Sequence, residues 1–391
     1  MKPVLIVGGG PVGLTAALCL AAAKVPVILF EADAAISQDL RASTFHPPTL
    51  DMLDAFALGA ELIAQGLVTP SWQIRLHETG ERAEFDLGVL KGETRHPYRL
   101  QCEQQKLQHL LLARLAGYAH ADIRFASTVD AVGQNADGVW VQVKGERLAG
   151  SWLIGADGSR SIVRRSCNIG FSGETYPETT ILVTTDFDFD QALEGLSGVN
   201  YVWSPTGTFS LLHLPSVWRC SFYPRPGQAL EEALSDAAIE QQLQCVVPLP
   251  ERYRVLDRRA YRIHQRVADT WRVGRMLLAG DAAHLNSPSG GMGMNGGVHD
   301  AFNLTEKLTR VVGGAYEGLL DLYVRQRRPI AIEHVIAQAD RNRRRMRETD
   351  PERRRTVLRD LQRTASNPEL ARSYLLNSAM ITGLRHAAAV T

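Results

Sequence analysis

Three glycine-rich segments contain the residues best suited to chemistry. The first is Gly8-Gly9-Gly10-Pro11-Val12-Gly13, the second runs from Gly155 to Ser161, and the third runs from Gly280-Asp281 to Gly297. Each follows a short apolar run and leads into a helical pattern. Glycine lets backbone amides approach a ligand closely, and a helix beginning there presents unpaired N–H groups to an anion. These spacings predict a phosphate-bearing ligand.

The first segment has the G-x-G-x-x-G spacing in its required context. Residues 3–8 predict a buried strand, residues 11–24 a helix and residues 26–31 a second strand, which together open a βαβ unit. Glu31 ends the second strand 18 residues after Gly13, where a carboxylate accepts hydrogen bonds from ribose hydroxyls. The segment therefore predicts dinucleotide binding. The alternative is a cluster of turn glycines beside a surface acid.

The other two segments each follow a predicted strand. Asp157-Gly158 comes after Trp152–Ile154, and an ordinary turn with a Ser or Asp N-cap is the alternative to a ligand site. The third segment follows a strand at Met276–Ala279 and leads into a long helix expected from about residue 298. So many glycines carry a high cost in conformational entropy on folding, which favours a segment whose backbone must approach a ligand closely. The alternative is a flexible loop.

Composition excludes several classes of protein. The chain has 391 residues, a net charge of +1 and 45% hydrophobic residues, so it is globular and has no bulk attraction to a polyanion. Its five cysteines are widely spaced and form no C-x-x-C, which predicts a reducing cytoplasm and no metal site. Glycines, Pro11, Lys24 and Pro26 interrupt the apolar N-terminus, so no membrane anchor is expected there.

Together the three segments resemble those of the FAD-dependent aromatic hydroxylases, the class A flavoprotein monooxygenases exemplified by 4-hydroxybenzoate hydroxylase. The resemblance spans nearly the whole chain, with motifs at 8–13, 155–164 and 277–297 in the expected order. It implies that FAD is the cofactor. The implied cofactor residues are Gly8, Gly10, Gly13 and Glu31 at the ADP half, Arg41 near the phosphates, Gln104 (with Gln101 as a competing choice), Asp157 and Gly158, Asp281 at a ribityl or ribose hydroxyl, and Pro288, Gly291, Met292, Gly293, Met294 and Asn295 against the isoalloxazine ring.

The same resemblance implies an enzyme that uses NADH or NADPH and molecular oxygen. A hydride reduces FAD, oxygen then forms a flavin C4a-hydroperoxide, and an electron-rich ring attacks its distal oxygen. Only one dinucleotide fingerprint is present, so NAD(P)H is expected to bind transiently over the same flavin. Glu31 faces FAD in this arrangement and does not choose between NADH and NADPH.

The expected fold is α/β, with a discontinuous Rossmann-like FAD-binding domain, a β-rich substrate domain and a helical C-terminal segment. The FAD-binding domain is expected at 1–70, 98–175 and 275–340, the substrate domain at 71–97 and 176–274, and the helical segment at 341–391. Residues 72–87 alternate around a Glu-Thr-Gly turn and predict a hairpin. Residues 341–363 contain ten arginines and four acids without interleaved aromatic residues, which favours a salt-bridged helix over a nucleic-acid site.

The sequence identifies the substrate-binding residues less precisely than the cofactor-binding residues. Tyr201 and His213 resemble the family's polar residues on the substrate-sheet strands and are the catalytic candidates. Thr44, Arg219 and Pro288 join them as candidate substrate contacts, with Arg225 as an alternative to Arg219; packing within the sheet is the competing interpretation for each. His46 is expected to start a helix, and His284 to contact cofactor phosphates.

The leading hypothesis is hydroxylation of a small phenolic or hydroxylated N-heteroaromatic substrate. The alternatives are a hydroxylase or epoxidase of a polyketide or prenylated substrate, and a non-catalytic FAD-binding redox protein. The expected partners are a small aromatic substrate and molecular oxygen, without nucleic acid or membrane, in a monomer or homodimer.

Overall fold

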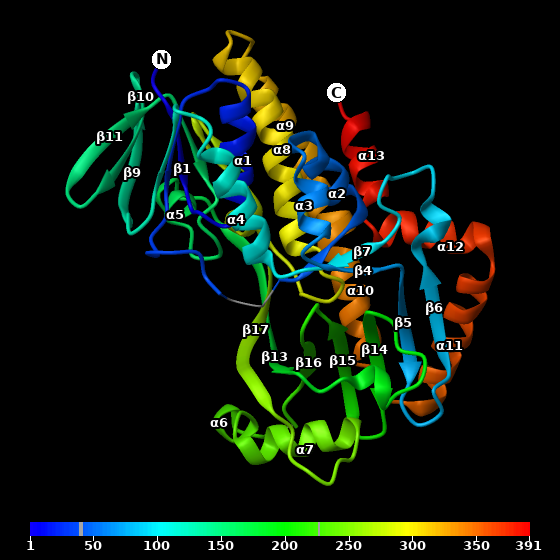
Figure 1. The fold of residues 1–391 in the computed structure, drawn as a ribbon. Coiled ribbons are helices and arrows are strands. Elements are labelled where there is room, and N and C mark those ends of the chain that lie inside the picture. Colours follow the sequence, from blue (N-terminus) through cyan, green and yellow to red (C-terminus); the bar gives the residue numbers. More distant parts are fainter. Residues whose placement is uncertain (39–41, 226) are drawn as a thin grey trace.

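The computed structural model describes residues 1–38, 42–225 and 227–391 (Figure 1). Arg41, the expected phosphate contact, lies outside these residues. The N-terminal βαβ unit forms as the sequence predicts. Strand β1 (Val4–Val7) leads into helix α1 (Pro11–Ala22), and β2 (Val27–Phe30) pairs with β1 in parallel. Helix α1 begins at Pro11. The missing N–H of a proline costs nothing there, because the N–H groups of the first turn have no partner within the helix.

A six-stranded sheet contains strands from three distant parts of the chain. Its order is β18 (Arg272–Val273), β19 (Met276–Leu278), β12 (Trp152–Gly155), β1, β2 and β8 (Ala121–Arg124), and every pair is parallel except β18 with β19. Because parallel strands bury both faces, the central strands β1, β2, β12 and β19 read as unbroken apolar runs, whereas the edge strand β8 contains Asp122 and Arg124. The discontinuous Rossmann-like arrangement is confirmed.

Helices cover one side of this sheet and a small β-meander lies near its other side (Figure 1). Helix α1 packs against α4 (Gln104–Leu115) and α8 (Gly293–Val312), and α8 packs against α9 (Leu319–Ile330). The meander consists of β9 (Val129–Asn135), β10 (Gly138–Val143) and β11 (Glu146–Gly150), and α5 (Ile162–Ser166) contacts both β9 and β12.

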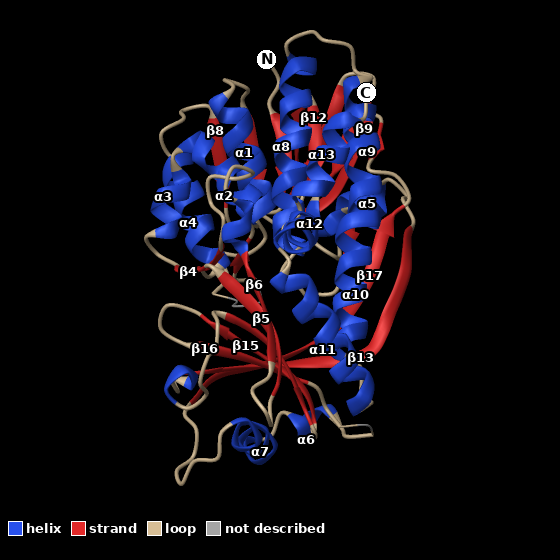
Figure 2. Cartoon of the chain, turned by 90° about the vertical axis from the view of Figure 1, so that its right-hand side faces the viewer, coloured by secondary structure: helices blue, strands red, loops and turns tan. Residues whose placement is uncertain are grey.

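The second large sheet has eight strands and is mostly antiparallel. Its order is β20 (His284–Leu285), β17 (Val255–Ala268), β13 (Phe171–Thr185), β16 (Trp218–Phe222), β15 (Gly207–His213), β14 (Val199–Ser204), β5 (Ser71–Leu76) and β6 (Arg82–Asp86). The predicted hairpin at 72–87 is confirmed as β5 and β6. The long strands β13 and β17 connect this sheet to the dinucleotide-binding part, and α6 (Leu230–Ala233) and α7 (Asp236–Val246) lie below it (Figure 2).

A third, small sheet links the two larger ones. It consists of β3 (Thr44–Phe45), β7 (Arg99–Gln101) and β4 (Leu67–Thr69). His46 occupies the N-cap position of α2 (Pro47–Leu53), so its expected place at a helix start is confirmed. A 3₁₀ turn at Asp54–Phe56 and α3 (Leu58–Ile63) follow.

The C-terminal segment is helical, as expected. A π-helical turn (Ala331–Ile336) continues α9 into α10 (Ala337–Met346), and α11 (Pro351–Ser366), α12 (Pro368–Ser378) and α13 (Ile381–Ala389) complete the chain. Tyr374 of α12 stacks on Phe85, which stacks on Trp72, so these helices cover the β5–β6 edge of the sheet. Several arginines of 341–363 form ion pairs with Glu178, Asp340, Glu352 or Asp360, as a salt-bridged helix requires. Within the described residues, no helix combines the length and apolar character of a membrane span.

Candidate active site

The first glycine segment forms a tight turn between β1 and α1. Gly8 has φ +105°, and a Cβ there would lie 2.3 Å from the carbonyl oxygen of Ala156. A Cβ on Gly13 would lie 1.9 Å from the carbonyl oxygen of Gly8, so this glycine lets the helix pack onto the strand. Gly10, the N-cap of α1, faces open space, since a Cβ there would meet no described protein atom within 4 Å. A phosphate can therefore approach the first turn of α1 at Gly10.

Glu31 and a glutamine hold this turn in place. The Glu31 carboxylate accepts hydrogen bonds from the amides of Gly9, at 2.5 Å, and Asp33, at 2.9 Å. Gln108 of α4, which the sequence reasoning missed, donates to the Gly9 carbonyl oxygen at 3.1 Å. Gln104 is the first residue of α4, whereas Gln101 lies in β7 and accepts a hydrogen bond from Thr44. The two candidate glutamines thus lie on different elements, and a cofactor contact of either stays a prediction.

Asp157 follows β12 and caps the next helix. Its Oδ2 accepts from the amides of Ile162, at 2.7 Å, and Val163, at 3.2 Å, while its buried Oδ1 has no hydrogen-bond partner among the described residues. Burial raises the pKa of Asp157, and these amides partly oppose the shift. Gly158 has φ +74° and faces open space. The N-cap of α5 is Ser161, whose hydroxyl accepts from the Arg164 amide at 3.0 Å, so the alternative of a Ser N-cap is real, and a cofactor contact at this turn stays a prediction.

The third glycine segment differs from expectation at its end. Helix α8 begins at Gly293, about five residues before the predicted start near 298, so Gly296 and Gly297 are helical. Local propensity disfavours glycine in helices, which explains the error. A Cβ on Gly297 would lie 2.5 Å from Cγ2 of Val12, so α8 can approach α1 closely only because this residue is glycine.

The Asn295 side chain fixes this first turn of α8. Its Nδ2 donates to the carbonyl oxygens of Thr44, at 2.8 Å, and Gly291, at 2.7 Å. Its Oδ1 accepts from the amide of His46, at 2.9 Å, and the hydroxyl of Thr49, at 2.7 Å. An amide side chain offers two donors and two acceptor positions, so all are in use. Any contact of Asn295 with a flavin would therefore come from its backbone.

Two histidines near this network are buried and neutral. The His46 Nε2 lies 2.8 Å from the Gly290 carbonyl oxygen, and the His299 Nε2 lies 2.9 Å from the Thr49 hydroxyl. Burial lowers the pKa of His46 to about 3, with a smaller effect from Arg99, and burial also lowers the pKa of His299 to about 3. Neither ring is protonated at neutral pH.

His284 lies in the core, so its expected contact with cofactor phosphates is wrong. Its Nε2 lies 2.9 Å from the Asp300 carboxylate, and its ring stacks on Trp271. Arg327 donates to the same carboxylate at 2.7 Å. Burial alone would raise the pKa of Asp300, but Arg327 and His284 outweigh it and lower that pKa. The strand β20, which carries His284, pairs with β17, and this directs the ring inward.

A cavity of about 230 Å³ lies between the third glycine segment and the eight-stranded sheet. Asp281, Pro288 and Gly291–Met294 form one side, and Ser43 and Thr44 another. The sheet, with the residue that follows β16, contributes Thr180, Leu182, Tyr201, Phe209, Ser210, Leu212, Arg219, Ser221, Tyr223 and Tyr261. The cofactor and substrate candidates Asp281, Pro288, Gly291, Met292, Gly293, Met294, Thr44, Tyr201 and Arg219 thus meet at one cavity.

His213 does not reach this cavity, so the expectation of a catalytic His213 is not supported. On β15, Ser210 and Leu212 face the cavity, and side chains alternate between faces along a strand. The His213 ring lies on the other face, stacked on Trp218 at 4.3 Å, with its Nδ1 3.3 Å from Asp190. Arg225 lies at a neighbouring groove, is not part of the cavity lining, and contacts Gln241.

Two tyrosines that the sequence reasoning missed line the cavity with Tyr201. Tyr223 follows β16 and Tyr261 lies in β17. Burial raises the pKa of Tyr223 to about 12, so its hydroxyl stays protonated and can donate a hydrogen bond. The available signal was the alternation in Arg219, Ser221 and Tyr223, which places all three on one face.

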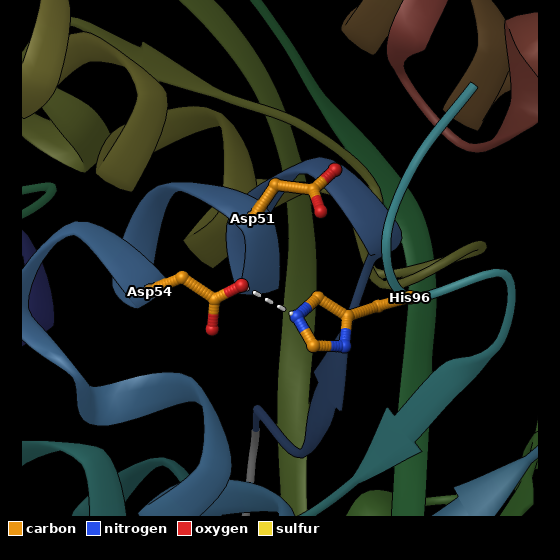
Figure 3. A group of neighbouring side chains, drawn as sticks. All are labelled: Asp51, Asp54 and His96. Atoms are coloured by element: carbon orange, nitrogen blue, oxygen red, sulfur yellow. Dashed lines mark hydrogen bonds and ion pairs between the residues drawn. The ribbon is translucent and has the colours of Figure 1, made fainter. Parts of the chain in front are cut away.

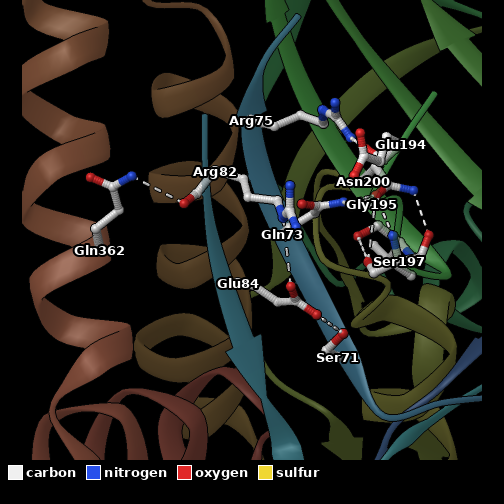
Figure 4. Close-up of polar contacts among 11 residues, drawn as sticks. Ser71, Gln73, Arg75, Arg82, Glu84, Glu194, Gly195, Ser197, Asn200 and Gln362 are labelled. Carbon is white, nitrogen blue, oxygen red and sulfur yellow. Dashed lines mark hydrogen bonds and ion pairs between the residues drawn. The ribbon is translucent and has the colours of Figure 1, made fainter. Parts of the chain in front are cut away.

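Polar contacts hold the strand that bears Tyr201. The neighbouring Asn200 accepts from Gln73 of β5 at 2.6 Å and donates to the carbonyl oxygens of Ser197, at 2.6 Å, and Leu211, at 3.2 Å (Figure 4). Gln73 also donates to the Gly195 carbonyl oxygen at 2.8 Å. These contacts fix the register of β14, and with it the side on which Tyr201 lies.

One group of side chains has a spacing that could suit a metal: Asp51, Asp54 and His96 (Figure 3). Their contacts within the protein account for it. The His96 Nε2 lies 2.9 Å from Asp54, and its Nδ1 lies 2.9 Å from the hydroxyl of Tyr98. Asp51 accepts from the Thr94 hydroxyl at 2.6 Å. The group attaches the segment before β7 to α2.

Comparisons with known proteins identify the family. A family model described as FAD binding domain matches residues 1–339. The 6-hydroxy-3-succinoylpyridine 3-monooxygenase of Pseudomonas putida (strain DSM 28022 / S16) is 36% identical over 345 residues, which cover 87% of each chain. The chain belongs to the FAD-dependent aromatic monooxygenases. The family resemblance read from the three glycine segments is confirmed.

Further relatives of this monooxygenase match nearly its whole length. The para-nitrophenol 4-monooxygenase of Pseudomonas sp. (strain WBC-3) is 34% identical over 400 residues, covering 98% of this chain and 96% of that protein. The crystal structure of p-nitrophenol 4-monooxygenase from Pseudomonas putida DLL-E4 superposes with a TM-score of 0.91 at 31% identity, covering 98% of each chain. The fold and the enzyme class therefore agree.

The residues of the monooxygenase fit FAD at both ends of the cofactor. At the ADP end, Gly10 leaves open space beside the α1 N-terminus, and Glu31 lies at the end of β2. At the flavin end, Gly291 has φ +67° and its Cβ would lie 2.8 Å from that of Thr44, so only glycine lets the loop run so close to β3. FAD is therefore the cofactor of this chain.

Proposed function

We propose that this monooxygenase hydroxylates a small phenolic or hydroxylated N-heteroaromatic substrate, with NADH or NADPH and molecular oxygen as co-substrates. The observation that carries the proposal is the cavity between Gly291–Met294 and the eight-stranded sheet, with Tyr201, Tyr223 and Tyr261 in its walls. Its volume of about 230 Å³ suits one substituted ring, since an engineered cavity of about 150 Å³ holds benzene. The substrates named for the two relatives above are also single rings.

When bound, FAD supplies the chemistry that accepts a hydride and activates oxygen. The chain's own residues position the ring and control its proton. Tyr201 is the candidate partner of the substrate hydroxyl, and Tyr223, which stays protonated, is a second donor at the same cavity. An unperturbed phenol ionises near pH 10, so hydrogen bonds to its oxygen would favour the more reactive phenolate at neutral pH.

Apolar walls and the α8 N-terminus complete the proposed roles. Leu182, Phe209, Leu212 and Met346 line the cavity and exclude water from the reacting atoms. Helix α8 begins at Gly293 beside the same cavity, so its N-terminal amides favour negative charge there. Thr44 and Pro288 would contact the ring where β3 and the glycine segment meet.

The test is the consumption of NADH and of NADPH by the FAD-loaded protein in air, with a panel of phenols, hydroxybenzoates, hydroxypyridines and quinolones. Product and hydrogen peroxide are measured together. We expect strong stimulation by at least one single-ring compound, with little peroxide and a hydroxylated product. Protein stripped of FAD is the control. Stimulation only by polycyclic compounds, or by none despite bound FAD, would reject the proposal in favour of the polyketide or non-catalytic alternatives.

A further inference from the structure

A buried arginine, Arg99, lies beside the substrate cavity. It is the first residue of β7 and is only 3% exposed. Its guanidinium lies over the ring of Trp72, 5.2 Å from the centroid, forms a hydrogen bond with the Tyr201 hydroxyl, and interacts electrostatically with the phenol of Tyr374. Among the residues that the structure describes, no Asp or Glu forms an ion pair with Arg99, and its Nε has no acceptor.

The buried arginines Arg327 and Arg354 have carboxylate or carbonyl partners. Arg327 pairs with Asp300, and Arg354 donates to the carbonyl oxygens of Glu348 and Ser204. Arginine stays charged when it is buried, and an uncompensated buried charge is strongly unfavourable. A guanidinium in the position of Arg99 is therefore a site that an incoming anion would complete.

The space beside Arg99 is small and adjoins the substrate cavity, with Tyr201 and Met346 lining both. It measures about 20 Å³, against about 230 Å³ for the cavity, and its described lining contains no acidic residue. A water-sized probe needs about 10–15 Å³, so the space admits one or two heavy atoms and no ring. The occupant must be a small group carried on a ring that stays in the larger cavity.

We propose that Arg99 binds an acidic oxygen group of the aromatic substrate, a phenolate or a carboxylate that reaches past Tyr201. The inference rests on the proposed hydroxylase function. Arg99 is distinct from Arg219, the sequence candidate for substrate contact, which lies on β16. The contacts of Asp51, Asp54 and His96 hold the segment immediately before Arg99 and so help to fix its position.

The test compares matched anionic and neutral ligands on the FAD-loaded protein. One arm uses 4-hydroxybenzoate against 4-hydroxybenzamide, and the other uses 4-nitrophenol below and above the pH at which it ionises. Dissociation constants come from the change in flavin absorbance on titration, without turnover. The variants are Arg99→Met and Arg99→Lys, and the control is Arg344→Met, an exposed arginine paired with Asp340.

We expect the wild type to bind the anionic member of one pair more tightly, and Arg99→Met to weaken that binding at least about tenfold, as for a lost charge-assisted hydrogen bond. The neutral ligand should change by less than about twofold, Arg99→Lys should retain part of the preference, and Arg344→Met all of it. Loss confined to the benzoate arm assigns a carboxylate, and loss confined to the nitrophenol arm assigns a phenolate.

Equal weakening of both members, or no weakening, would overturn the proposal, because it would show a structural role or none. If Arg99→Met does not retain FAD, the wild type and Arg99→Lys are compared instead. The proposal is overturned if the wild type shows no preference for the anionic ligand, or if Arg99→Lys keeps the full preference of the wild type. An anion preference that depends on Arg99, found in a protein that hydroxylates nothing, would sustain this subsite and reject the hydroxylase function.

Discussion

Replacing Asn295 tests whether its four hydrogen bonds hold the flavin side of the cavity together. They join α8 to the carbonyl of Thr44, the amide of His46 and the hydroxyl of Thr49, and also close onto Gly291. The side chain is completely buried, so no water replaces these bonds when they are removed. Asn295→Ala should therefore destabilise the fold and loosen the loop that forms one wall of the cavity.

The magnitude follows from the number of bonds. Each hydrogen bond contributes about 0.5–1.5 kcal/mol net, so four give about 2–6 kcal/mol of unfolding free energy. Because Gly291–Met294 would no longer be held against β3, the dissociation constant of FAD should rise at least about tenfold. Asn303→Ala, on the same helix, is the control: it removes two part-buried side-chain bonds, one to Gln326 and one from Lys307, and should leave FAD affinity unchanged.

The assay is urea unfolding of the FAD-free protein, with a separate titration of FAD by quenching of its fluorescence. Asn295→Asp adds a sharper comparison, because it keeps the size of the side chain but presents an oxygen to two carbonyl oxygens in place of an N–H donor. It should be at least as destabilising as Asn295→Ala. An unfolding free energy within about 1 kcal/mol of the wild type, with normal FAD affinity, would refute the reasoning.

Three further predictions follow from single contacts. Gly10→Ala should leave the stability of the FAD-free protein unchanged but weaken FAD binding at least about tenfold, since its Cβ would meet no described protein atom yet would occupy the phosphate approach; a titration of FAD with both forms checks this. Because the pKa values of His46 and His299 are about 3 in the fold, the unfolded chain binds more protons between pH 6.5 and 3. As the pH is lowered through that window, the unfolding free energy should fall by up to about 1.4 kcal/mol per pH unit for each histidine. In urea unfolding, His299→Gln should show a shallower dependence of this free energy on pH. Tyr201→Phe should slow hydroxylation by about 10²-fold or more and raise peroxide release, whereas His213→Ala, on the opposite face of the sheet, should leave both within about threefold; steady-state assays of both products distinguish the two.

The glycine turn between β1 and α1 could be predicted from the sequence because its constraints are local. Gly8, Gly10 and Gly13 lie within six residues, and the backbone geometry that requires them depends on one strand, one turn and one helix. The same holds for Glu31, which ends the next strand. The start of α8 was misplaced because Gly296 and Gly297 argue against a helix locally, while the contacts that make them helical come from Val12 and Asn295.

The substrate face could not be predicted with the same security because both faces of the eight-stranded sheet are covered. One face lines the cavity, and the other packs against α7 through residues such as Leu211 and Leu243. When both faces are buried, the alternation of side chains shows which residues of a strand share a face, but it does not show which of the two faces meets the ligand. His213 and Leu212 differ by one position and lie on opposite faces, so a correct strand assignment still led to a residue that does not line the cavity.

The residues that distinguish this site from a generic dinucleotide fold are paired over long distances in the chain. Asn295 bonds to Thr44, 251 positions away, and Arg99 meets Tyr201 only after β7 and β14 have been brought to the same cavity. No local spacing encodes such pairs, and each polar group would be costly to bury alone. The fully hydrogen-bonded amide of Asn295 and the guanidinium of Arg99 both follow from the cost of burying a polar group without a partner. The protein satisfies all four hydrogen-bonding positions of the Asn295 side chain itself, and it leaves the Arg99 charge for the substrate to pair.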